Sequence, residues 1–214
     1  MDRVRILEEG LPFWVSIARS QKTGFYLDQR EMRKLVRGLA AGRHVLNAFA
    51  YTGSFSVYAL KGGAVRADSV DSSENAIGLA QENFELNRLP ADSGYFFTAD
   101  IFEFLRGPDL DYDFIILDPP AFAKKKPDVV QACRGYKDIN RLAIQKVRPK
   151  GLVLTFSCSH FVDESLFQKV VFQAAREADR RVRILQRHHQ ALDHPVNIYH
   201  PETEYLKGLL LYVD

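Results

Sequence analysis

A cysteine between two serines is the most reactive group that the sequence offers. Residues 152–161 read LVLTFSCSHF, and Cys158 stands where the apolar, strand-forming part of this run stops. A thiolate there could attack carbon 6 of a pyrimidine, which makes carbon 5 nucleophilic enough to accept a methyl group. We expect Cys158 to precede a helix, whose N-terminus would favour the thiolate. A metal ligand and a buried packing residue are the alternatives, since free cysteine is among the most buried residue types.

Acidic residues follow three successive strand-like runs, in which Asp71 ends SVD, Asp100 ends FFTAD and Asp118 ends FIILD. The turn after the preceding run, NAFAYTGSFS at residues 47–56, has one glycine, Gly53, where a dinucleotide fingerprint has three. Ligands of open α/β sheets bind at the carboxyl ends of the strands. Carboxylates there favour a nucleoside with a cationic or amino-acid tail, such as S-adenosylmethionine, with Asp71 accepting from the ribose hydroxyls. Helix capping by aspartate is the alternative.

A stiff loop with a double proline follows one of these strands, in LDPPAFAKKK at residues 117–126. Prolines restrict their own backbone and that of the residue before them, so the loop could be a rigid turn and no more. Its functional interpretation is a grip on a base extruded from RNA, with Phe122 stacking on the base. Enzymes that methylate exocyclic amines use a similar loop with an aromatic residue after the second proline, where this chain has Ala121. Phosphate contacts are expected from Lys124, Lys125, Lys126, Arg134 and Lys137.

Strand-like and helix-like segments alternate along most of the chain. Such alternation predicts a parallel sheet covered on both faces by helices. The end differs, because a strand and a final apolar run have no helix between them, which predicts an antiparallel last strand added as a hairpin. The expected strands are residues 12–18, 44–50, 65–70, 95–98, 114–117, 152–156, 182–185 and 205–213, and the clearest helices are 31–41, 73–87 and 164–178.

Bulk composition sets outer limits on the function. The chain has 214 residues, 46% of them hydrophobic, and a formal net charge of +2, so a nucleic-acid partner would have to bind a local basic patch. Its two cysteines, Cys133 and Cys158, form no CxxC motif, and no run resembles a signal peptide or a membrane span. We therefore expect a cytoplasmic protein without a membrane partner or a metal. The histidines at 188, 189, 194 and 200 are expected in an exposed or hydrogen-bonded loop.

Seven motifs together resemble one known family. They are KTGFYLDQR, NAFAYTGSFSVYAL, VDSSENAIGLAQENFELN, LDPPAFAKKK, ACRGYKDINRLAIQ, TFSCSH and DHPVNIYHPETEYLKG. In this order they are similar to the catalytic domain of the bacterial large-subunit ribosomal RNA cytosine-5 methyltransferases, over nearly the whole chain. The resemblance implies a Rossmann-like class I methyltransferase fold with a seven-stranded, mostly parallel sheet, an antiparallel last strand and a short N-terminal β extension. Residues 1–30 would form that extension and a cofactor-closing segment, and residues 31–214 the methyltransferase domain.

The same resemblance implies roles for individual residues. Cys158 matches the nucleophile, and the base that removes the carbon-5 proton is open among Asp118, His160 and water. The implied partner is ribosomal RNA, and the oligomeric state is open, a homodimer included. Family members carry an N-terminal PUA-type domain, so a fragment or a minimal member is expected. Methylation of guanine or an exocyclic amine, and a non-catalytic RNA module, are the alternative functions. The implied S-adenosylmethionine site comprises Thr23, Phe25, Gln29, Arg30, Asn47, Phe49, Tyr51, Thr52, Gly53, Asp71, Ser72, Asp100, Ile101 and Asp118.

Overall fold

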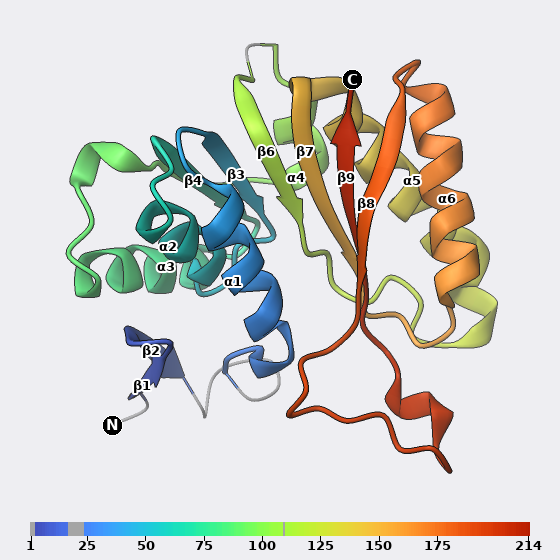
Figure 1. Cartoon of the computed structure of the whole chain (residues 1–214), viewed down its shortest axis with the longest axis horizontal. Helices are drawn as coiled ribbons and strands as arrows, with labels where there is room; N and C mark the ends of the chain where they lie inside the picture. Colours follow the sequence, from blue (N-terminus) through green and yellow to red (C-terminus); the bar gives the residue numbers. More distant parts are fainter. Residues whose placement is uncertain (1–2, 17–23, 109) are drawn as a thin grey trace. The chain divides into compact units, whose positions relative to one another are not determined.

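The computed structural model describes residues 3–16, 24–108 and 110–214. The chain divides into two compact units, residues 1–101 and residues 102–214 (Figure 1), and each is described by itself. Among the described residues, no helix is long and apolar enough to span a bilayer.

Unit 1 contains a three-stranded parallel sheet in the order β5-β4-β3. Its longest helix shows how local sequence sets the limits of an element, because the Ser73 hydroxyl accepts a hydrogen bond from the Ala76 amide and caps the helix. The strands are β3 (His44–Ala48), β4 (Arg66–Asp71) and β5 (Phe96–Thr98), and the helices are α1 (Arg30–Leu39), α2 (Ser54–Lys61) and α3 (Glu74–Leu86). The predicted segments in this unit are therefore confirmed to within a few residues, apart from α2, whose limits were not predicted.

An antiparallel hairpin precedes this sheet and packs on the same unit. Its strands are β1 (Arg3–Glu8) and β2 (Leu11–Ser16), and Phe13 on β2 lies in a buried cluster with Phe25 and Tyr58. The hairpin is also tied to α3, because Asn83 accepts a hydrogen bond from the Trp14 amide at 2.6 Å. The predicted N-terminal β extension is thus present, while the domain boundary at residue 30 stays a prediction.

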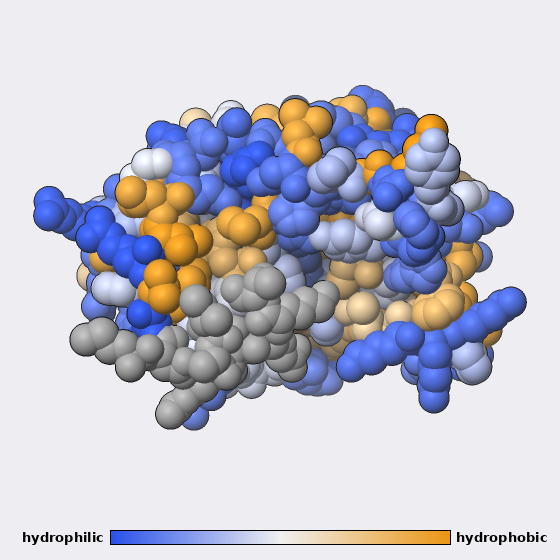
Figure 2. Space-filling view, turned by 90° about the horizontal axis from the view of Figure 1, so that it is seen from below, coloured by the Kyte–Doolittle hydropathy of each residue, from blue (hydrophilic) through white to orange (hydrophobic). Residues whose placement is uncertain are grey.

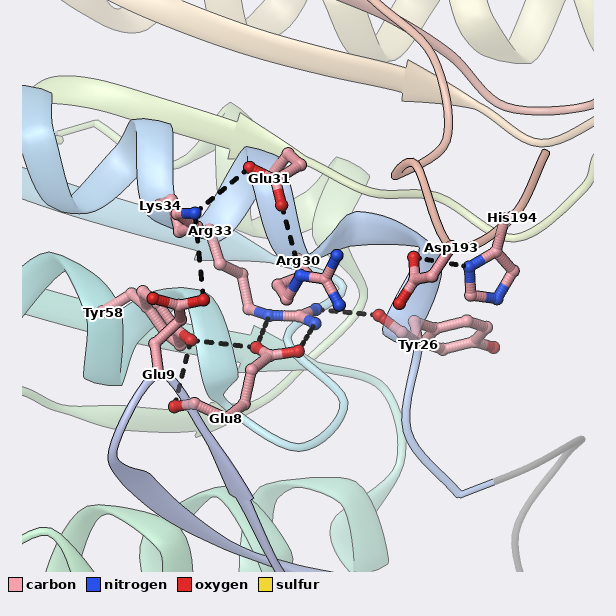
Figure 3. A network of polar contacts seen from close by, with 10 residues as sticks. All are labelled: Glu8, Glu9, Tyr26, Arg30, Glu31, Arg33, Lys34, Tyr58, Asp193 and His194. Atoms are coloured by element: carbon pink, nitrogen blue, oxygen red, sulfur yellow. Dashed lines mark hydrogen bonds and ion pairs between the residues drawn. The ribbon is translucent and has the colours of Figure 1, made fainter.

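A buried ion pair links the hairpin to α1 (Figure 3). The Arg33 guanidinium donates two hydrogen bonds to the Glu8 carboxylate, at 2.6 and 2.7 Å, and a third to the Tyr26 carbonyl at 2.9 Å. Arg33 is only 1% exposed and Glu8 5% exposed, so both charges are withdrawn from water. The Tyr58 hydroxyl donates to the same carboxylate at 3.0 Å. Burial, and after it the charge of Glu8, raises the pKa of Tyr58.

Unit 2 has four strands in the order β6-β7-β9-β8. β6 and β7 are parallel, and β9 is antiparallel to both β7 and β8. The antiparallel last strand is therefore confirmed, and it lies between two earlier strands. The strands are β6 (Tyr112–Leu117), β7 (Val147–Ser157), β8 (Val182–His188) and β9 (Lys207–Val213), and the helices are α4 (Ile101–Arg106, beginning at the last residue of unit 1), α5 (Val129–Lys146) and α6 (Glu164–Glu177).

The two units together contribute seven strands, and β9 runs antiparallel to both of its neighbours. This arrangement agrees with the predicted α/β, Rossmann-like methyltransferase fold. Seen from below, the surface mixes hydrophobic groups with hydrophilic ones (Figure 2). Large apolar side chains exposed on the molecule include Leu7, Leu192, Ile198 and Tyr199, the last three in the loop between β8 and β9.

Candidate functional site

The loop that leaves β3, residues 49–53, has an unusual backbone. Phe49 and Tyr51 have φ angles of +63° and +46°, a region that residues with a side chain seldom occupy. Gly53, with φ of +69°, caps α2, and a Cβ atom on it would lie 2.8 Å from the Cβ atom of Ala80. Only glycine therefore fits at this position. Strained backbone of this kind concentrates at ligand sites, because the shape that a binding loop needs can require φ and ψ angles of higher energy.

Asp71 holds this loop in place from the end of β4. One carboxylate oxygen accepts a hydrogen bond from the Tyr51 amide at 3.0 Å, and the other from the Ser73 amide at 2.9 Å. Each oxygen of a carboxylate can accept more than one hydrogen bond, so the half-buried Asp71 can also receive donors of a ligand. The helix-cap interpretation of Asp71 is wrong, because the side chain that caps α3 is Ser73.

Other residues predicted for the cofactor lie at the same strand ends in unit 1. Asn47 is 1% exposed at the end of β3, and its Nδ2 donates to the Ser56 hydroxyl at 3.0 Å. Its Oδ1 is buried and accepts no hydrogen bond within the part of the chain that the structure describes. An oxygen in that position suits an N–H or O–H donor of a ligand. Thr52 and Ile101 are buried, whereas Ser72 and Asp100 are exposed.

The residues of the predicted cofactor-closing segment make contacts within unit 1. Phe25 is 4% exposed, and its ring packs 5.2 Å from that of Phe13 with the Arg33 guanidinium over it at 4.6 Å. Its ring thus serves the core of unit 1. Gln29 is buried, and Arg30 forms an ion pair with Glu31 at 3.2 Å. Thr23 lies outside the described residues.

In unit 2, Cys158 and the Asp-Pro-Pro loop (residues 118–126) come together. Cys158 directly follows β7, and its Sγ atom lies 3.9 Å from the Pro119 carbonyl oxygen. Asp118, half-buried, directly follows β6, which pairs with β7. Parallel pairing of neighbouring strands therefore places the two motifs at one edge of the sheet. Cys158 is partly exposed, as a nucleophile must be, and both Cys158 and Cys133 are free thiols.

The two serines around Cys158 hold the backbone that presents it. Ser157 and Ser159 are fully buried. The Ser159 hydroxyl accepts a hydrogen bond from the Ala123 amide at 3.1 Å and lies 2.9 Å from the Tyr136 hydroxyl of α5. The Ser159 carbonyl accepts from Lys207 Nζ at 2.7 Å. The Asp-Pro-Pro loop, α5 and β9 thus all fix the position next to the thiol.

The helix predicted to follow Cys158 is present as α6, but a turn separates it from the cysteine. Residues 159–163 form a turn, and α6 begins only at Glu164. Its N-terminus is already capped by Asp163, whose carboxylate accepts from the Leu166 amide at 2.7 Å. The nearby positive group is instead the ammonium of Lys207, whose pKa is affected by the charge of Cys158. Sequence reasoning missed Lys207, although a lone lysine in the apolar run YLKGLLLYV was a visible signal.

The residues predicted to bind RNA do not share one environment. Lys124, Lys125 and Lys126 are exposed, as is Arg134 on α5. Lys137 forms an ion pair with Glu177 at 2.6 Å, which competes with phosphate. Phe122 is half-buried, with its ring centroid 4.6 Å from that of Tyr136, so one part of this ring already has an aromatic neighbour.

Three histidines of the loop between β8 and β9 pair with acids, as predicted for a hydrogen-bonded loop. The pairs are His189 with Glu204, His194 with Asp193 and His200 with Glu202, at 3.1, 3.1 and 3.2 Å. His188 is buried at the end of β8, and burial lowers its pKa. No group of three or more metal-ligating side chains occurs among the residues that the structure covers.

Comparison with known proteins gives consistent results. A family model for S-adenosylmethionine-dependent methyltransferases matches residues 1–197. The ribosomal RNA large subunit methyltransferase I of Photobacterium profundum is 47% identical over 213 residues, which are 98% of this chain and 54% of that protein. Its namesake from Aeromonas salmonicida is 47% identical over 211 residues, 97% of this chain and 53% of that protein. The chain thus spans about half the length of these curated relatives.

Among solved structures, a methyltransferase in complex with SAH, the product form of the methyl donor, has a TM-score of 0.88 and 31% identity to this chain. The match covers 99% of this chain and 56% of the other. Because the match covers nearly the whole chain, it supports the fold class.

Proposed function

Because the chain belongs to the family of S-adenosylmethionine-dependent methyltransferases, we propose that it methylates carbon 5 of a cytosine in large-subunit ribosomal RNA. The observation that supports this most strongly is the approach of the Cys158 thiol to the Asp-Pro-Pro loop, with Sγ 3.9 Å from the Pro119 carbonyl oxygen. A base held by this loop would meet a nucleophile that amine methylation does not need. The names of the relatives support ribosomal RNA as the substrate, and such an enzyme would act in the bacterial cytoplasm.

The proposed reaction uses Cys158 as a covalent catalyst. Its thiolate adds to carbon 6 of the cytosine, and the ring electrons move to carbon 5. S-adenosylmethionine would supply an electrophilic methyl group, whose bond to the sulfonium sulfur breaks as carbon 5 takes it up, with S-adenosylhomocysteine as the leaving group. Asp118, which directly precedes Pro119, accepts the proton from carbon 5 in this proposal. The electrons of that C–H bond restore the ring double bond as the bond between carbon 6 and sulfur breaks, which regenerates the thiolate.

The cofactor would be held at the strand ends of unit 1. Asp71 would accept from the two ribose hydroxyls, and the buried Asn47 Oδ1 would accept from a donor of the amino-acid part. The strained loop of Phe49, Tyr51 and Gly53 would fit around the ligand. These residues match S-adenosylmethionine better than a dinucleotide, because the loop has one glycine and no lysine or arginine for a pyrophosphate.

Replacing Asp71 by alanine should weaken binding of S-adenosylmethionine by about 1.5 to 3 kcal/mol, the range for hydrogen bonds to a charged group. Isothermal titration calorimetry measures this directly and needs no RNA. Asp68→Asn is a control on the same strand. The Asp68 carboxylate accepts a hydrogen bond from the Tyr95 amide at 3.0 Å and pairs with Arg66, so it is engaged within the protein and its replacement should leave cofactor affinity unchanged. An unchanged dissociation constant for Asp71→Ala would remove Asp71 from the cofactor site.

Replacing Lys124, Lys125 and Lys126 together by glutamine should weaken RNA binding and flatten its salt dependence. Each lost phosphate contact lowers the slope of log K against log salt by about 0.7 for single-stranded RNA. Binding measured at several salt concentrations gives the slope, and cofactor affinity should stay at the parent value. Lys150→Gln, an exposed lysine within β7, is the control. Equal slopes for the triple variant and the parent would mean that the three lysines make no phosphate contacts.

Methyl transfer from labelled S-adenosylmethionine to unmodified ribosomal RNA tests the proposed function as a whole. The labelled RNA is digested to nucleosides, and mass spectrometry identifies the product. We expect 5-methylcytosine at a single position. A methylated guanine or a methylated exocyclic amine would contradict the proposal and leave Cys158 a structural residue.

A further inference from the structure

Lys207 is the first residue of β9 and lies beside the strand end that carries Cys158. In the antiparallel pairing of β7 with β9, Lys207 is directly opposite Ser157, the residue before the cysteine. It is 5% exposed, which is rare for a lysine, because burying an ammonium costs free energy unless the charge is compensated. The position of this charge therefore requires an explanation.

Hydrogen bonds compensate part of the buried charge of Lys207. Lys207 Nζ donates to the carbonyl oxygens of Ser159 and Tyr205, at 2.7 Å each. An ammonium has three N–H donors, so these two bonds leave one to be directed at another acceptor. Burial lowers the pKa of Lys207 to about 8, and the charges of Cys158, Asp163 and Glu204 act in the opposite direction. Two neutral carbonyls alone do not compensate a full buried charge.

The two carboxylates near Lys207 are engaged elsewhere. Asp163 caps α6 through the Leu166 amide, and Glu204 pairs with His189 at 3.1 Å. Of the three anionic groups that act on Lys207, Cys158 has the largest influence. Burial raises the pKa of the Tyr136 hydroxyl, which lies 2.9 Å from the Ser159 hydroxyl, and the charge of Cys158 raises it further. A neutral tyrosine adds no charge, so the ammonium is the group suited to balance a thiolate here.

We propose that Lys207 is the positioning residue that keeps Cys158 ionised, by balancing the thiolate and by fixing the backbone of the turn through the Ser159 carbonyl. The inference deepens the proposed function and rests on it, because a thiolate at this place matters only if Cys158 attacks the base. Lys207 also lines a cavity of about 970 Å³ with His160, Asp163 and Glu204, and Cys158 itself is partly exposed, so a small reagent can reach the thiol. Lys207 takes over the task that a helix N-terminus performs at other reactive cysteines.

The test is the rate at which iodoacetamide alkylates Cys158 as a function of pH, measured by mass spectrometry on the whole chain without RNA. Lys207→Gln keeps hydrogen-bond donors but removes the charge. We expect Cys158 in this variant to react more slowly near pH 7, with the midpoint of its rate against pH shifted upward by about one unit. The two rates should converge at high pH, where the thiol ionises in either protein and Lys207 loses its proton above about pH 8. Cys133 is an internal reference whose rate should not change.

Lys207→Arg keeps the positive charge and should restore most of the reactivity, a result that a purely structural role of the lysine does not predict. If Lys207→Gln does not fold, the arginine variant still tests the proposal, because its pH profile for Cys158 should stay close to that of the parent. Equal profiles for the parent and Lys207→Gln would overturn the proposal. Because no methyl transfer is measured, this outcome is independent of whether the RNA product is 5-methylcytosine.

Discussion

Cys158→Ala should lower methyl transfer by a factor on the order of 10⁴ or more, because a reaction through a covalent adduct has no substitute for its nucleophile. Affinity for S-adenosylmethionine should remain near the parent value, since the predicted cofactor residues at the ends of β3, β4 and β5 do not include the thiol. The measurement is the initial rate per folded molecule, with binding followed by calorimetry. Cys133→Ala is the matched control, because Cys133 lies on α5 and burial raises the pKa of its thiol.

A mechanism-based substrate makes this result sharper. An RNA with fluorine at carbon 5 of the target cytosine cannot lose a proton after methylation, so the adduct with Cys158 should persist through denaturing electrophoresis. The alanine variant should form no such complex. A packing cysteine makes the opposite forecast, namely a loss of about 1 kcal/mol of stability for a small cavity with full activity in the folded fraction. Turnover or trapping by Cys158→Ala would thus refute covalent catalysis at this residue.

Arg33→Met should destabilise the fold by about 3 to 5 kcal/mol, because it leaves the Glu8 carboxylate buried without its partner. Arg33 on α1 donates to Glu8 of the hairpin at 2.6 and 2.7 Å, so its loss also loosens β1 and β2 from α1 (Figure 3). Chemical denaturation measures the change. The double variant Glu8→Leu with Arg33→Met should recover much of the loss, because it removes both charges.

The neighbouring pair of Lys34 and Glu9 is a built-in control. The side chains of Lys34 and Glu9 are 45% and 41% exposed, and Lys34 Nζ lies 3.8 Å from a Glu9 carboxylate oxygen. Lys34→Met should therefore change the free energy of unfolding by no more than about 1 kcal/mol. A cost for Arg33→Met as small as that of Lys34→Met would contradict the assigned role of the buried pair. The raised pKa of Tyr58 gives a second check, because the folded state then keeps a proton that the unfolded chain loses. Stability should fall as pH rises above about 10 in the parent.

The sequence predicted most elements because their signals are local. The second half of β6 and the core of β7 are apolar runs, and α3 has its cap and its apolar stripe within one short segment. The placement of β9 between β7 and β8 was not predicted, because pairing over long sequence distances leaves no local pattern. Strand β7 begins at Val147, five residues before the predicted start, because the polar residues 148–150 continue its backbone while exposed or half-buried.

The candidate site likewise combines features with a local signal in the sequence and contacts that have none. Asp71 and Cys158 were predicted from strand ends, which are visible in sequence, and the structure places Asp71 at the end of β4 and Cys158 directly after β7. Their roles in binding and catalysis stay predictions. Phe25 was assigned to the cofactor, whereas its partners Phe13 and Arg33, distant in sequence, hold it in the core. The same holds for Lys137, whose partner Glu177 lies 40 residues away. A residue's competing partners become visible only in three dimensions.

The place of β9 between β7 and β8 also bears on the order in which the two units fold during synthesis. The strands of the unit 1 sheet are complete once Thr98 has been made, whereas β8 pairs with β9 and stays outside the sheet until residues 207–213 leave the ribosome. Nascent chains grow at about 5 to 20 residues per second, and their N-terminal parts fold first. We therefore expect unit 1 to fold while unit 2 is still being synthesised. Lys207 comes to lie opposite Ser157 only when β9 pairs with β7, so under the proposal above the Cys158 thiol is not activated before β9 is in the sheet.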